Sequence, residues 1–61
     1  MKVLICKQNE QLIQEIFPSQ KLTFEVFTKN TCTFNISTRS FDKLVERIKE
    51  KGYNPYALLT W

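Results

Sequence analysis

The clearest pattern in the chain is an alternation of apolar and polar residues between positions 21 and 38. The residues between the apolar positions are mostly Thr, Glu, Asn and Ser, and the apolar positions are Leu22, Phe24, Val26, Cys32, Phe34 and Ile36. Such alternation is typical of strands with one buried face. Two successive runs predict a β-hairpin. We expect Val26 to pair with Cys32 and Phe24 with Phe34, because this register keeps the apolar side chains on one face.

A first helix is predicted over residues 9–17, directly before Pro18. Asn9 is an acceptable N-cap, and a residue that precedes proline avoids the helical region, so the helix must end there. A strand over residues 10–17 is the alternative, but it would place neighbouring apolar residues on opposite faces. The apolar positions at i, i+1, i+4 and i+5 are Leu12, Ile13, Ile16 and Phe17.

A second helix is predicted over residues 40–52, where the apolar spacing is most regular. Ser40 is a natural N-cap, and Gly52 suits the position just after the last turn. The residues at i, i+3, i+4 and i+7 are Phe41, Leu44, Val45 and Ile48. This spacing gives the helix one apolar face for the core.

Two further strands are expected, over residues 1–6 and after Pro55 up to residue 61. The predicted order, β-α-β-β-α-β, resembles the ferredoxin-like arrangement, in which two helices cover one face of a four-stranded antiparallel sheet of order 4-1-3-2. This resemblance concerns the order of elements alone, so it implies no function. We therefore expect residues 1–61 to form a single α+β domain.

Composition narrows the class of protein. The 61 residues are 43% hydrophobic, which suffices for one small core, and the net charge of +3 comes from interspersed charges, not from a basic run. The N-terminal apolar run is too short for a signal peptide, and no segment approaches the roughly 20 apolar residues of a membrane span. We therefore predict a cytoplasmic protein with no membrane partner.

The two cysteines are expected to be free thiols. In the predicted sheet we expect the first and third strands to run parallel. That direction would place Cys6 and Cys32 at opposite ends of the sheet, too far apart for a disulfide.

Several kinds of chemistry lack their usual residues. The sequence contains no histidine, one glycine and two cysteines. Histidine is the commonest general base and metal ligand near neutral pH, and phosphate-binding loops are rich in glycine. We therefore predict a non-enzymatic protein without a metal, cofactor or small-molecule substrate.

An apolar surface is the first candidate for a functional site. The first and last predicted strands are apolar on both faces, whereas two helices cover only one face of a sheet. The other face is therefore expected to expose an apolar patch of a size that monomers rarely leave bare. We predict that this patch binds a second copy of the chain, or a larger protein for which it acts as adaptor or inhibitor. Its residues are Leu4, Tyr56, Leu58 and Trp61.

A basic stripe on the second helix is the alternative site. Lys43, Arg47 and Lys51 recur every four residues, and Arg39 lies just before the helix. This stripe favours contact with a phosphate backbone, and Phe27 on the polar face of the hairpin suits the stacking of a base. A solvated helix face explains the same charges, because acidic residues lie alongside. A small ribonuclease that depends on Arg47 is a third, weaker hypothesis.

Overall fold

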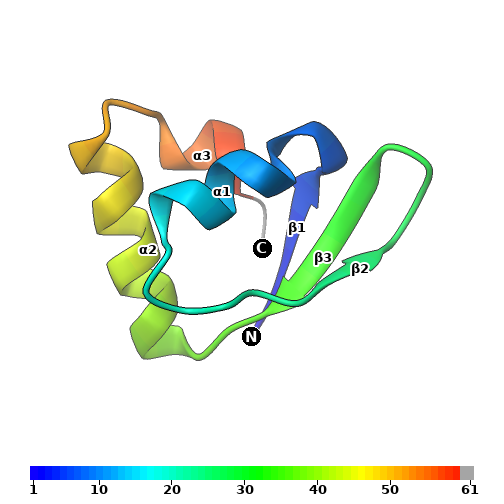
Figure 1. Cartoon of the computed structure of the whole chain (residues 1–61), viewed down its shortest axis with the longest axis horizontal. Coiled ribbons are helices and arrows are strands. Elements are labelled where there is room, and N and C mark those ends of the chain that lie inside the picture. The colour runs from blue at the N-terminus through cyan, green and yellow to red at the C-terminus, as the bar shows by residue number, and fades with distance from the viewer. Residues whose placement is uncertain (60–61) are drawn as a thin grey trace.

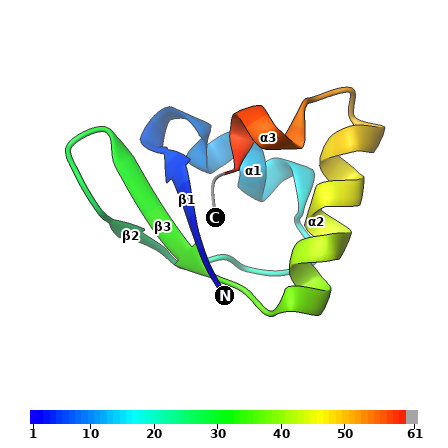
Figure 2. The same cartoon turned by 180° about the vertical axis from the view of Figure 1, so that it is seen from behind.

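The computed structural model describes residues 1–59, which form a small α+β protein. Its elements are β1 (Lys2–Cys6), the short 3₁₀ helix η1 (Lys7–Asn9), α1 (Glu10–Ile16), β2 (Phe24–Val26), β3 (Thr31–Asn35), α2 (Thr38–Glu50) and α3 (Pro55–Leu58). The β2–β3 hairpin lies at one end of the molecule and α2 at the other, with α1 and α3 between them (Figures 1 and 2).

The predicted four-stranded ferredoxin-like sandwich of order 4-1-3-2 is wrong. Within residues 1–59 the sheet has three strands in the order β1-β3-β2, and residues 56–58, expected to begin a fourth strand, lie in α3 instead. Asn54 Oδ1 accepts a hydrogen bond from the Tyr56 N–H at 2.9 Å, and proline occupies the first turn. A capping asparagine followed by proline starts a helix well, because proline has no N–H to leave unsatisfied. Residues 60 and 61 lie outside the described residues.

The hairpin has the predicted register. Phe24 lies opposite Phe34 and Val26 opposite Cys32 in the antiparallel pair of β2 and β3. The rings of Phe24 and Phe34 meet edge to face, with their centroids 5.4 Å apart and their planes at 73°. The alternation therefore fixed which side chains share the inner face of the sheet, the face that the helices cover.

The two cysteines are free, as expected, but their predicted separation is wrong. β1 and β3 are antiparallel, which places Cys6 opposite Thr31 and Cys32 opposite Ile5. The crossover from β1 to β2 keeps the strand direction and the hairpin then reverses it, so β3 must run against β1. Successive side chains point to opposite faces of a sheet, so Cys6 is exposed while Cys32 is buried in the core.

One hydrophobic core joins the inner face of the sheet to the helices. α1 and α2 bury the apolar faces that their spacing predicts, and Leu59, just after α3, is also buried. The buried apolar residues are Val3, Ile5, Ile13, Ile16, Phe17, Leu22, Cys32, Phe34, Ile36, Phe41, Leu44, Ile48 and Leu59. Within residues 1–59 Thr33 is the one buried polar residue, and it lies on the outer face of the sheet.

The N-cap of α2 lies three residues earlier than predicted, at Ser37 instead of Ser40, and Gly52 follows the last turn as predicted. Ser37 is its N-cap, and Ser37 Oγ accepts a hydrogen bond from the Ser40 N–H at 3.2 Å. At the other end Gly52 has a φ of 88°, the Gly52 N–H donates to the Lys49 carbonyl and the Tyr53 N–H donates to the Ile48 carbonyl. This pair of hydrogen bonds is a Schellman motif, which requires the left-handed conformation that glycine adopts readily.

Candidate functional site

β2 is hydrogen-bonded to the sheet along one side only. In an antiparallel sheet the backbone groups of alternate residues point to one neighbouring strand and then to the other. Met1 and Ile36 exchange two hydrogen bonds, of 2.7 and 2.9 Å, so the even-numbered residues of β3 point toward β1. The odd-numbered residues of β3 point toward β2, and accordingly the Phe27 N–H donates to the Thr31 carbonyl at 3.1 Å.

The same alternation directs the backbone N–H and C=O groups of Phe24 and Val26 away from β3. Within residues 1–59 no strand lies beyond this edge of the sheet. We call these four backbone groups the β2 edge. They form a row of two donors and two acceptors in extended geometry, which is the arrangement that pairs with a further strand.

Large apolar side chains flank the β2 edge. Val26 is 75% exposed and the following residue, Phe27, is 62% exposed. They point to opposite faces of the hairpin because they are consecutive in extended chain. Natural proteins usually protect an open edge with lysine, proline or a bulge. β2 contains none of these, and its one charge, Glu25, lies on the outer face.

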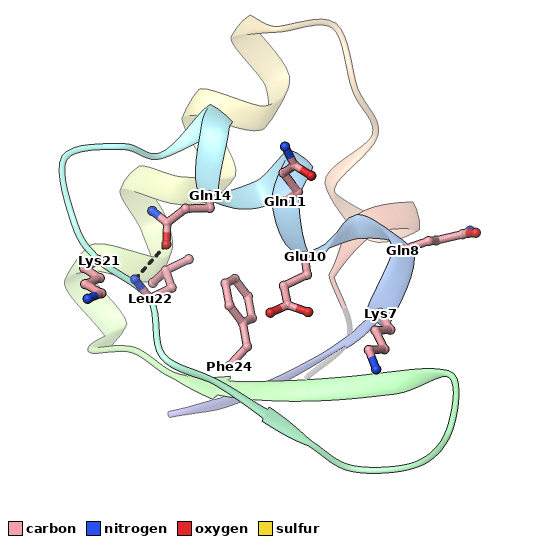
Figure 3. A pocket seen from close by; sticks show the side chains of 8 residues that line it. All are labelled: Lys7, Gln8, Glu10, Gln11, Gln14, Lys21, Leu22 and Phe24. Carbon is pink, nitrogen blue, oxygen red and sulfur yellow. Dashed lines mark hydrogen bonds between the residues drawn. The ribbon is translucent and has the colours of Figure 1, made fainter.

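A groove runs between α1 and β2 on the inner face, beside the β2 edge (Figure 3). Its volume is about 570 Å³. The Phe24 ring projects from β2 toward α1, and the Glu10 carboxylate lies next to it. The residues that line the groove are Lys7, Gln8, Glu10, Gln11, Gln14, Lys21, Leu22 and Phe24.

One side chain, Gln14, holds the wall of this groove in place. Gln14 Nε2 donates to the carbonyls of Phe17 and Gln20, at 3.3 and 3.0 Å, and Gln14 Oε1 accepts from the Leu22 N–H at 3.0 Å. These bonds join α1 to the loop that leads into β2. They fix the position of Leu22, which is buried, and so set the distance between α1 and the start of β2.

The charges of the groove are arranged along its length. Lys21 and Lys7 lie toward opposite ends, and Glu10 lies between them (Figure 3). Burial raises the pKa of the Cys32 thiol, and the Glu10 carboxylate raises it further against a smaller, opposite effect of Lys7. Cys32 therefore stays protonated at neutral pH and acts as a small apolar residue of the core.

The structure does not assemble the predicted apolar patch as one sheet face, because residues 55–58 form α3 and not part of a fourth strand. Leu4 is half-buried on the outer face of β1, while Leu58 is half-buried and packs against the core. Tyr56 is 76% exposed on α3. Trp61 lies outside the described residues. The assignment of these four residues to an interface stays a prediction.

The alternative, basic site is divided between two ends of the molecule. Arg39, Lys43, Arg47 and Lys51 are all exposed on or just after α2. The hairpin that carries Phe27 lies at the opposite end (Figures 1 and 2). Acidic side chains lie among the cations, since Glu46 and Glu50 share a shallow depression with Lys43 and Arg47. The stripe and the aromatic residue therefore do not form one surface.

Sequence reasoning missed the β2 edge and the groove. The predicted order 4-1-3-2 already placed residues 22–26 at the edge of the sheet, and Phe27 broke the polar side of the alternation. Those two signals together indicated an unprotected edge with apolar neighbours. The groove had no comparable signal, because it depends on how far α1 extends over the sheet.

No protein-family model matches the chain, and searches of curated proteins and of solved structures give no match either. No helix within residues 1–59 has the length and apolarity that a bilayer crossing requires. Over the same residues no three Cys, Asp or Glu side chains come together as a metal site.

Proposed function

We propose that this chain is a small, non-enzymatic binding protein that acts on another protein through strand addition at the β2 edge. The observation that carries the proposal is the row of outward-facing backbone groups at Phe24 and Val26, flanked by exposed Val26 and Phe27 side chains. In strand addition, backbone hydrogen bonds supply affinity, while alternate side chains supply specificity. Two free thiols favour a reducing compartment, and we place the protein in the cytoplasm.

The partner is a different protein and not a second copy. If two β2 strands paired over their full length about a twofold axis, Phe24 would face Val26 of the second copy. Glu25 would then lie directly opposite Glu25, and like charges in that position destabilise a strand pair. A foreign extended segment carries no such restriction.

A photocrosslinking experiment in cells tests this function. A photoreactive phenylalanine analogue is placed at position 27, beside the edge, and at position 56, an exposed aromatic site on α3, as the matched control. We expect position 27, but not position 56, to capture one defined protein. The substitution Val26→Pro should abolish the capture, because it removes an N–H that points outward while leaving the β2–β3 hydrogen bonds intact.

Three results would contradict the proposal. A crosslinked species of twice the chain mass would show that the occupant is a second copy. Capture that survives Val26→Pro would show that the edge is not the binding surface. Recovery of nucleic acid, with binding that falls by orders of magnitude between about 50 and 200 mM salt, would favour the basic stripe of α2.

A further inference from the structure

The groove beside the β2 edge specifies the chemistry of the strand that binds there. We propose that it accepts an extended segment of the partner in which one apolar side chain is flanked, two residues away on each side, by acidic side chains. This inference depends on the proposed function, because it assumes that the segment lies along the β2 edge.

The geometry of a strand added at the β2 edge directs alternate side chains of that strand toward the groove. In a strand added beside β2, every second side chain points to the inner face of the sheet, which is the face on which the groove lies. Three successive inward side chains, at positions i, i+2 and i+4, span about 13 Å. A single segment therefore presents three side chains along the groove, and its other side chains point to the outer face.

The centre of the groove suits an apolar side chain. Phe24 is only half-buried, although its ring already packs edge to face on Phe34. Leu22 forms the adjoining wall, and the three hydrogen bonds of Gln14 hold it there. A side chain at i+2 that covers the exposed part of the Phe24 ring removes apolar surface from water on both partners.

The ends of the groove suit carboxylates. Lys21 and Lys7 lie toward opposite ends, and both are exposed. Glu10 lies near the middle, where it disfavours an acidic side chain at i+2 but leaves the two ends positive. The acidic–apolar–acidic order of the segment therefore complements the order of charges along the groove.

Synthetic peptides of seven residues, with blocked ends, test the inference against the purified full chain. The reference peptide has Glu, Leu and Glu at i, i+2 and i+4, with Thr and Val at the intervening positions. Binding is measured by fluorescence anisotropy at about 50 mM salt. We expect Leu→Ser at i+2 to weaken binding about tenfold or more, and Glu→Lys at both ends to weaken it by a similar factor.

Charge reversal on the protein supplies the matched control. Lys21→Glu should weaken the reference peptide about three- to tenfold and should strengthen the peptide with lysine at i and i+4. Lys43→Glu, which makes the same change on α2 at the other end of the molecule, should alter neither affinity. This exchange of preference requires a folded groove, so a variant that fails to fold cannot imitate it.

The outcomes separate this inference from the proposed function. If the peptides bind with affinities that ignore their charges and their central residue, yet Val26→Pro abolishes binding, the edge is used and the groove inference is wrong. If no peptide binds while the crosslinked partner is still captured from position 27, the groove inference is again wrong and the function stands. If Val26→Pro leaves peptide binding unchanged, strand addition itself is wrong.

Discussion

Replacement of Gln14 by alanine should destabilise the protein far more than the same replacement three residues earlier. Gln14 makes three hydrogen bonds to backbone groups of the segment 17–22, whereas Gln11 makes one long hydrogen bond, 3.4 Å, to Glu15 on the exposed side of α1. The two glutamines share one helix and one residue type. The difference between their alanine variants therefore reports the tertiary contacts and not helix propensity.

The size of the effect follows from those three bonds. A hydrogen bond in a folded protein contributes about 0.5–1.5 kcal/mol net to the free energy of unfolding, and a buried group left without its partner costs about 1–3 kcal/mol. Gln14 is half-buried, so water replaces part of what is lost, and we expect Gln14→Ala to reduce the free energy of unfolding by about 2 kcal/mol. A chain of this length has a total free energy of unfolding of about 3–9 kcal/mol. The loss of about 2 kcal/mol in Gln14→Ala should therefore lower the melting temperature by about 10 °C.

Urea unfolding followed by far-ultraviolet circular dichroism measures the difference. Gln11→Ala should change the free energy of unfolding by less than about 0.5 kcal/mol, as expected for an exposed site. Gln14→Glu retains the acceptor for the Leu22 N–H but sets a carboxylate against the carbonyls of Phe17 and Gln20. At neutral pH the Gln14→Glu variant should lose at least as much free energy of unfolding as Gln14→Ala. Part of this stability should return below about pH 4, where the carboxyl group is protonated and can donate a hydrogen bond again. Equal stability of the Gln14→Ala and Gln11→Ala variants would refute this account of the groove wall.

Four further predictions concern Ser37, Gly52 and the two cysteines. Ser37→Ala should reduce stability by about 1 kcal/mol in the same urea assay, whereas Ser40→Ala should change it little, because only the Ser37 hydroxyl caps α2. Gly52→Ala should reduce the free energy of unfolding by about 1–2 kcal/mol because of the positive φ at this position. Steric contact should add nothing to this loss, since nothing lies within 4 Å of an added Cβ. Ellman's reagent should titrate one thiol in the native protein, Cys6, and two in urea. Stability should fall as the pH rises above the unfolded thiol pKa of about 8.5, because the raised pKa keeps folded Cys32 protonated; Cys32→Ala should lack this loss.

The parts of the fold that local patterns determine were predictable. The register of the hairpin follows from alternation, and both helices bury the faces that their spacing indicates. The start of α2 was predicted one turn too late, because Ser37 and Ser40 are equally good cap residues and lie one turn apart. The structure uses Ser37, which adds a turn to the N-terminal end without changing the buried face.

The last segment shows where local reasoning was insufficient. A short apolar run fits a buried strand and a turn of helix equally well, and periodicity over so few residues does not separate them. Asn54 caps this turn of helix and Pro55 occupies its first position, a signal that the predicted strand after Pro55 left out of account. The predicted interface rested on that strand, so the error in the fold carried over to the site.

The choice of β2 over the other open edge follows from the side chains beside it. β1 is also an edge strand within residues 1–59, and its outward-facing residues are Lys2, Leu4 and Cys6. Lysine at an edge disfavours the addition of another strand. The side chains of these residues also point to the outer face, where no helix of residues 1–59 adds a second wall. β2 combines an edge without lysine with an exposed valine and a groove on its inner face, whereas the inner side chains of β3, Cys32 and Phe34, are buried. The inner face of β2, unlike that of β3, is therefore left open to the partner strand that we propose.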